Sequence, residues 1–296
     1  MDQRTPLGHV EPGRRGVDRR HDLALLHLAV LLFGAAGLFG KLIDLTPAAL
    51  VFARATIAAA FVFVLVQVRR HPIRLRRRTD LLVFLGIGVL LAVHWVAFYR
   101  SVQVSTVSIA VLAVATFPVF TALLAPLTAG RLPARRDVLL ALTAFAGVAV
   151  IVGRVDLGGA VTQGVLWGVT ASALFAVLAI LNERLIVGYA GPTVALYQFG
   201  IAAAVLAPFS AGALRSVDGG DWLLLALFGT LITAVPHTLL ITSMRRFTST
   251  TASLTVSLEP VYGITLAALI LDETPSPRVL IGGAIIATAV LVGTRR

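Results

Sequence analysis

Two charged residues stand inside long apolar segments: Glu259 in 248–271 and Arg54 in 47–68. A charge at the centre of a bilayer costs about 2.5–3.5 kcal/mol on insertion scales, so each such residue calls for a partner or a cavity. Glu259 is suited to proton coupling or to holding a cationic group. Its alternative is a paired or protonated carboxyl that only orders the helix bundle.

Arg54 carries a planar guanidinium that matches the geometry of a carboxylate. It could bind a carboxylate of a substrate, or pair with Glu259 or Asp44. The competing interpretation is that this long side chain snorkels to the outer headgroups.

His94 and His237 lie at nearly matched places before Ser101 and Ser243. A histidine titrates near neutral pH and can relay protons. The alternative is a core imidazole bonded to a backbone carbonyl, and His27 presents a weaker version of the same choice.

Other polar and aromatic residues are candidates for contact with a substrate. Lys41 and Asp44 are three residues apart, which favours a simple surface pair. Gln198 could bond a substrate or a neighbouring helix. The aromatic candidates for the walls of a cavity are Trp95, Tyr99, Trp167, Tyr197 and Tyr262, although interface belts and helix packing explain most such residues.

Two long apolar segments about 140 residues apart match each other, and each holds a proline near its middle. The first is SIAVLAVATF, Pro118 and VFTALLAPLTAGR, and the second is TTASLTVSLE, Pro260 and VYGITLAALILDE. Each proline removes a backbone hydrogen bond and breaks its helix. An internal repeat in a membrane-embedded chain is typical of secondary transporters, with the substrate site between the halves. We therefore expect both prolines to face a central cavity.

The composition indicates a membrane protein. The 296 residues are 58% hydrophobic and 13% charged, whereas soluble domains average about 25% charged residues. The arginines sit in short segments between apolar stretches, which argues against a nucleic-acid partner. The chain has no cysteine, so disulfide and thiolate-metal chemistry are excluded, and we expect no metal site and no cofactor.

Ten stretches are long and apolar enough to span a bilayer as helices. They are 23–43, 47–68, 80–99, 104–129, 136–153, 161–182, 192–212, 221–243, 248–271 and 278–294. A cytoplasmic N-terminus places 19 of the 25 Lys and Arg residues on the cytoplasmic side and 5 on the other. The positive-inside rule then predicts that both termini are cytoplasmic.

Ten spans divide into two halves of five. Because five is odd, the second half enters the membrane from the opposite side, so the sequence predicts an all-α membrane protein with two inverted five-helix repeats. The repeats occupy 23–153 and 161–294. The Arg-rich residues 1–22 are expected to be a disordered cytoplasmic tail. A basic tail before an apolar segment also resembles a signal peptide, but nine further apolar segments favour a first membrane helix.

Several short motifs resemble those of EamA-family permeases of the drug/metabolite transporter superfamily. They are Leu32-Phe33-Gly34 and its counterpart Leu166-Trp167-Gly168, then Gly40-Lys41, Pro47, Arg54, the proline-broken fourth and ninth spans, and Glu273. Phe33 replaces the usual Trp, and Arg131 stands where the family usually has Glu. The resemblance implies a ten-helix carrier of the cytoplasmic membrane that exports amino acids, metabolites or drugs.

The leading hypothesis is thus a secondary carrier of a small molecule that acts by alternating access, with protons as the favoured driving ion, and that is not an enzyme. An intramembrane enzyme would need a constellation such as H-E-x-x-H or G-x-S-x-G, and the sequence has neither. A passive channel usually carries a filter motif, which the sequence also lacks. The lipid bilayer is the other expected partner, and the oligomeric state, a homodimer included, stays open.

Overall fold

The computed structural model describes residues 12–128, 130–186, 188–243, 256 and 258–294. The elements within these ranges are helices, with no strand among them. Those of the first half are α1 (Pro12–Leu42), α2 (Pro47–Val68), α3 (Asp80–Val104), α4 (Val107–Val114), α5 (Phe117–Leu127) and α6 (Arg135–Val152). Those of the second half are α7 (Ala160–Ile186), α8 (Gly191–Ser210), η1 (Ala211–Ser216), α9 (Gly219–Gly229), the π-helical turn η2 (Thr230–Ala234), α10 (Val235–Ser243), α12 (Glu259–Ile270) and α13 (Pro277–Thr294).

Seven helical stretches in the described residues are long and apolar enough to cross a membrane, and two shorter ones, Glu259–Ile270 and Pro277–Gly293, are also apolar. The ten predicted spans are therefore confirmed only in part. Residues 248–255 and 257 of the predicted span 248–271 lie outside the described residues. α6 has 18 residues but is not one of the seven stretches, because it begins with three charged residues, Arg135, Arg136 and Asp137.

The helix starts follow local capping chemistry, with one correction to the sequence predictions. Thr46 accepts a hydrogen bond from the backbone N–H of Ala49 and precedes Pro47 at the start of α2, as expected for a capped helix. α9 is capped by Asp218, whose carboxylate accepts a hydrogen bond from the N–H of Asp221 at 2.9 Å. Since α1 begins at Pro12, residues 12–22 are helical, and the predicted disordered tail is wrong there. Residues 1–11 lie outside the described residues.

The proline of the first repeat breaks its helix as predicted. α4 ends at Val114, and α5 begins at Phe117 with Pro118 in its first turn. Proline has no N–H to donate to the carbonyl four residues earlier, which here is that of Val114. Ser172 of α7 donates its hydroxyl to that carbonyl at 3.2 Å, so the second half satisfies the acceptor that the break leaves free.

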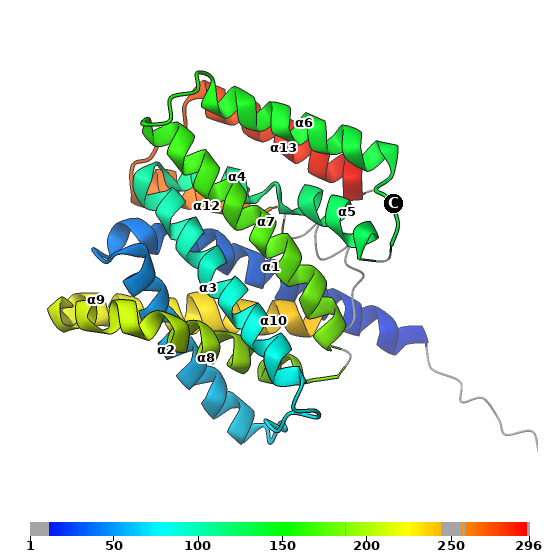
Figure 1. The fold of residues 1–296 in the computed structure, drawn as a ribbon, viewed down its shortest axis with the longest axis vertical. Coiled ribbons are helices and arrows are strands. Elements are labelled where there is room, and N and C mark those ends of the chain that lie inside the picture. Colours follow the sequence, from blue (N-terminus) through cyan, green and yellow to red (C-terminus); the bar gives the residue numbers. More distant parts are fainter. Residues whose placement is uncertain (1–11, 129, 187, 244–255, 257, 295–296) are drawn as a thin grey trace, which may run out of the picture.

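The packing of the helices repeats when the two halves are exchanged. α1 packs on α12, as α7 packs on α4 and α5; α3 packs on α7, as α10 packs on α1. α2 packs on α8, and α6 packs on α13. Figure 1 shows α6 and α13 side by side at one end of the molecule, away from α2 and α8. This exchange is the pattern expected of two related halves about a pseudo-twofold axis.

The glycines of the duplicated motif both lie at close crossings with the proline-broken helix of the other half. A Cβ on Gly34 of α1 would stand 2.7 Å from the Cβ of Tyr262 on α12, and one on Gly168 of α7 would stand 2.5 Å from the Cβ of Ala113 on α4. Small residues let membrane helices approach this closely. The motif therefore fixes how the first helix of each half crosses the proline-broken helix of the other.

The loop between α2 and α3 is tied to the start of α8. Tyr197 donates its hydroxyl to the carbonyl of Ile73, and Thr193 donates to that of Pro72. The Tyr189 hydroxyl donates to Asp80 and accepts from the N–H of Arg76. Burial, together with the hydrogen bond to Asp80, raises the pKa of Tyr189. The hydroxyl therefore stays protonated and keeps this contact between the halves at neutral pH.

Candidate substrate cavity

A cavity of about 50 Å³ lies between helices of both halves. Its walls come from α1, α2, α3, α4, α7, α10 and α12, together with Val256. Six residues singled out in the sequence line it: Arg54, His94, Trp95, Tyr99, His237 and Glu259. Two opposite charges, two imidazoles and an aromatic wall therefore meet in one enclosure.

Arg54 is 2% exposed, so the competing interpretation, that it snorkels to the outer headgroups, is wrong. Its Nη1 donates to the Tyr99 hydroxyl at 2.7 Å. Its guanidinium carbon lies 3.9 Å from the ring centroid of Trp95 and 4.5 Å from that of Phe228. Aromatic faces attract a cation through the ring quadrupole, so three side chains hold the guanidinium in one place.

Hydrogen bonds leave most of the Arg54 donors unused. Its Nε is buried without a hydrogen-bond partner, and in the part of the chain that the structure describes Arg54 forms no ion pair with Glu259 or Asp44. A buried charge without a counter-charge is costly. The guanidinium can therefore donate further hydrogen bonds to an acceptor.

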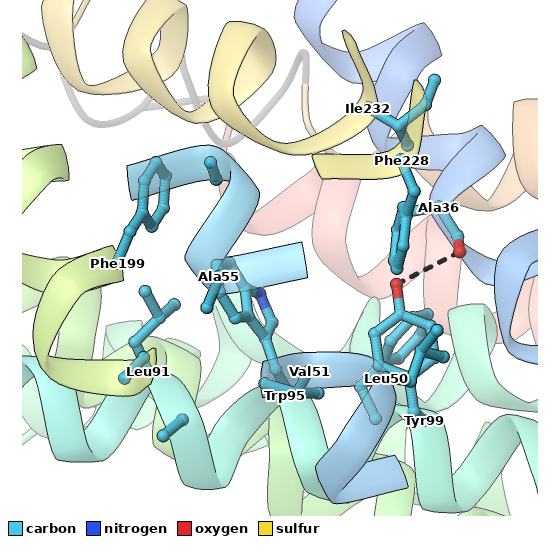
Figure 2. Packing of buried hydrophobic residues seen from close by; sticks show 14 of the residues in the cluster. Ala36, Leu50, Val51, Ala55, Leu91, Trp95, Tyr99, Phe199, Phe228 and Ile232 are labelled. Atoms are coloured by element: carbon cyan, nitrogen blue, oxygen red, sulfur yellow. Dashed lines mark hydrogen bonds between the residues drawn. The ribbon is translucent and has the colours of Figure 1, made fainter. Parts of the chain in front are cut away.

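Tyr99 anchors this donor group. Its hydroxyl accepts from Arg54 and donates to the carbonyl of Ala36 on α1 at 3.1 Å. Figure 2 shows this bond, with Phe228 beside the Tyr99 ring and Trp95 on the same helix. The chain Arg54–Tyr99–Ala36 thus links α2, α3 and α1, and fixes the orientation of the guanidinium relative to the cavity.

Glu259 enters the cavity from the first turn of α12, next to Pro260. Its carboxylate makes no hydrogen bond or ion pair with the residues that the structure describes. The residue at the matched place in the first half is Phe117, which packs on Phe175 with ring centroids 5.1 Å apart. The acidic group is therefore a feature of the second half alone.

The two histidines face the cavity with their side chains fixed by backbone carbonyls. His94 Nδ1 lies 2.8 Å from the carbonyl oxygen of Ala171, and His237 Nδ1 lies 3.2 Å from that of Thr233. A carbonyl only accepts, so the proton of each neutral ring is on Nδ1 and Nε2 is an acceptor. The alternative of a carbonyl-bonded core imidazole describes these bonds correctly, yet both rings also line the cavity.

A π-helical turn positions His237. Pro236 cannot donate to the carbonyl of Ile232, and the helix widens into η2 just before it. Thr233 donates its hydroxyl to the carbonyl of Phe228 at 2.7 Å. Such π-bulges interrupt helices frequently at functional sites, and this one turns His237 toward Phe33 and Trp95, with ring centroids 4.7 and 5.1 Å away.

The structure places the remaining polar candidates outside the cavity. Lys41 donates to the carbonyl of Ser105 at 2.8 Å, so the predicted surface pair with Asp44 is wrong. Gln198 is buried and donates to the side chain of Asn182 on α7.

Three of the aromatic candidates and both prolines also lie elsewhere. Trp167 is 42% exposed, Tyr197 belongs to the α2–α3 loop contacts, and Tyr262 packs on the core beside the cavity. Neither proline lines the central cavity. Pro260 lines a second, apolar cavity of about 230 Å³ formed with α4 and α13, so the prediction that the two prolines face each other across the centre is wrong.

Sequence reasoning missed the phenylalanines of the wall. Phe33, Phe98 and Phe175 line the cavity, and the Phe175 ring stacks on that of His94 at 4.9 Å. Phenylalanine occurs in eight of the ten predicted spans, so nothing in its spacing separates these three. Of the three, only Phe33 belongs to a motif identified in the sequence, Leu32-Phe33-Gly34. Among the described residues no group of three or more His, Asp or Glu could hold a metal ion.

Comparison with known proteins identifies the family to which this chain is similar. Residues 23–153 and 162–294 each match the EamA-like transporter family, which agrees with the two predicted repeats. An uncharacterized transporter of Bacillus subtilis (strain 168), YxxF, is 26% identical over 245 residues, covering 81% of this chain and 78% of that protein.

The fold is also found in a solved structure. A crystal structure with 20% sequence identity superposes with a TM-score of 0.64, over 92% of this chain and 96% of its own. That identity shows the shared fold alone. The duplicated family match and the apolar helices together identify a multi-pass membrane protein that belongs to the EamA-like transporter family.

Proposed function

We propose that this protein is a secondary transporter of the cytoplasmic membrane that exports a small metabolite, amino acid or drug-like solute by alternating access. The observation that carries the proposal is the central cavity, which holds Arg54 and Glu259 between helices of both halves. A site at the interface of two repeats can be exposed to either side when one half rocks against the other.

Glu259 is proposed to couple transport to protons. It is an acidic residue in the cavity, and it has no counter-charge bonded to it in the described part of the chain. A carboxyl in such a place binds a proton when the site opens to an acidic side and loses it on the other. His94 and His237 are the other candidates for this proton.

The test is transport by the purified full-length protein in sealed vesicles, against a panel of amino acids and cationic drugs, with and without a proton gradient. We expect saturable transport that accelerates when solute is also present on the far side, because a carrier returns faster when loaded. A passive channel would give flux without this acceleration. No transport of any solute in the panel by a well-folded protein would count against the proposal.

Glu259→Gln keeps the size and hydrogen bonding of the side chain but removes titration. We expect it to abolish transport or to remove its dependence on the proton gradient. Glu183→Gln is the matched control, since Glu183 is an exposed carboxylate on α7. Normal gradient-driven transport by Glu259→Gln would remove Glu259 from coupling and leave the two histidines.

A further inference from the structure

We propose that the solute bound in the central cavity is a monocarboxylate, held by Arg54, and that Glu259 is protonated when it binds. The inference rests on the proposed function, since it names the substrate class of the same cavity. It follows from how Arg54 is held, from the donors it leaves free, and from the charges that share the cavity.

Only one of the three nitrogens of the Arg54 guanidinium is hydrogen-bonded to the described residues. Nη1 is bonded to Tyr99, whereas Nε is buried and unpaired and Nη2 has no partner among the described residues. Nε and Nη2 together form the side edge of a guanidinium, and a carboxylate fits such an edge with two parallel hydrogen bonds. An amide or an alcohol offers one uncharged acceptor and leaves the second donor unpaired.

The surroundings hold the guanidinium in one orientation. Trp95 and Phe228 lie against the guanidinium, and Tyr99 fixes Nη1 to the carbonyl of Ala36 through its own hydroxyl. The guanidinium is thus oriented before the solute arrives, and little side-chain freedom is lost on binding. Tyr99 is accordingly a positioning residue: it acts on the solute through Arg54.

The charges in the cavity determine the state of Glu259. Arg54 and an ionised Glu259 cancel each other, so a bound carboxylate leaves one excess negative charge in this partly open cavity. An uncompensated charge in such surroundings is costly, and one proton on Glu259 removes it. The carboxylate and the proton therefore enter the cavity together.

The other titratable groups that face the cavity are Arg54, His94, Tyr99 and His237. Both histidines use Nδ1 on backbone carbonyls, so Nε2 is the atom at which either of them could take the proton instead of Glu259, and the Glu259→Gln variant separates the two cases. α1 and α4 pack on α12. From Ala24 to Leu42 of α1, the titratable residues are His27 and Lys41, and both are exposed; α4 has none.

The first experiment needs no variant. Binding of benzoate, its neutral analogue benzamide and the cation benzylamine to the detergent-purified full-length protein is measured by titration calorimetry. We expect benzoate to bind at least roughly tenfold more tightly than benzamide or benzylamine, a ratio that corresponds to about 1.4 kcal/mol. Equal or tighter binding of benzamide or benzylamine overturns the assignment of a carboxylate.

The second experiment follows the proton. Repeating the benzoate titration in buffers of different ionisation enthalpy measures protons taken up, and we expect close to one per benzoate at neutral pH and tighter binding as the pH falls. In Glu259→Gln we expect benzoate to bind with no proton uptake and with no change of affinity over the same pH range. Uptake that persists in this variant assigns the proton to a histidine and overturns the role of Glu259.

Variants of Arg54 and Tyr99 complete the test. Arg54→Lys keeps the charge but loses the side edge, and Tyr99→Phe leaves the guanidinium but releases Nη1. We expect both to weaken benzoate binding, Arg54→Lys by roughly tenfold or more, and neither to change benzamide binding. Arg100→Gln removes an exposed arginine at the end of α3 and serves as the control. Unchanged benzoate affinity in Arg54→Lys overturns the proposal.

Binding and transport separate the two proposals. Benzoate binding that depends on Arg54 without flux in vesicles supports the site and contradicts the transporter. Saturable transport of amines or neutral solutes, without carboxylate binding, supports the transporter and overturns the substrate class.

Discussion

Glu273, just after the end of α12, reaches the N-terminus of a helix in the other half. Its Oε2 accepts a hydrogen bond from the backbone N–H of Val107 at 2.9 Å, in the first turn of α4. Thr106 accepts from the N–H of Ile109 in the same turn. Exposed N–H groups and the helix dipole favour a negative charge at such a place. Arg131, the counterpart of Glu273 in the first half, has no acceptor side chain, so this contact exists on one side only.

Glu273→Gln and Glu273→Ala test this contact. Gln keeps an acceptor and loses only the charge, at a cost of about 0.3–1 kcal/mol, whereas Ala also loses the hydrogen bond, at a further cost of about 0.5–1.5 kcal/mol. Thermal unfolding in detergent should therefore give the order wild type, Gln, Ala. Asp272→Asn, which removes the neighbouring exposed charge, is the control. An Ala variant as stable as the wild type would show that the contact contributes nothing.

At the residue scale, charge was the most informative signal in the sequence. Arg54, Glu259, His94 and His237 attracted attention because polar groups are expensive in apolar segments, and all four line the cavity. Gln198 is equally polar but pairs with Asn182. Whether a buried amide bonds a neighbouring helix or faces the cavity depends on how its helix is rotated. These helices are apolar on all sides, so their sequences do not show which face of each helix points toward the cavity.

At the element scale, the duplicated glycines give a direct prediction. Gly34→Ala and Gly168→Ala each place a methyl group against a neighbouring Cβ at 2.7 and 2.5 Å, so the helices must separate. Overpacking of this kind costs about 1–3 kcal/mol. We expect both variants to unfold at lower temperature in detergent and to transport more slowly in vesicles.

The matched control for these two glycines is Gly86→Ala on α3, which meets no atom within 4 Å. Alanine forms helices more readily than glycine by about 1 kcal/mol, so this variant should be as stable as the wild type or more stable. If Gly34→Ala and Gly168→Ala behaved like Gly86→Ala, the close crossings would have no part in the packing of the halves.

The helix boundaries show what local sequence determines. α2 spans 47–68, as predicted, because Thr46-Pro47 caps its start and the basic loop ends it. The break before Pro118 was also predicted, but the partner of the freed Val114 carbonyl was not. Ser172 lies 58 residues further along the chain, and only the packing of α7 on α4 brings it there.

At the scale of the whole molecule, the repeat was visible in the sequence and the position of its cavity was not. Two prolines at a fixed offset predicted related halves, and the exchanged helix contacts agree with that. The prolines themselves do not line the central cavity. Glu259, one residue before Pro260, lines the cavity together with residues of α1, α2, α3, α4, α7 and α10. The cavity depends on how several all-apolar helices rotate against one another, which periodicity cannot reveal.

The orientation of these halves in the membrane is the last prediction, and it rests on the distribution of Lys and Arg. The loop after α12 should be outside and the loop before α3 inside. Thr274 and Thr79 lie in these loops, both exposed, and the chain has no native cysteine. Thr274→Cys in intact cells should react with a membrane-impermeant maleimide, whereas Thr79→Cys should react only after the membrane is opened. The reverse pattern would invert the sidedness of both halves. Seven predicted spans lie between the two positions. Labelling of both from outside would mean that an even number of spans separates them, and so would contradict the topology of two inverted five-span halves.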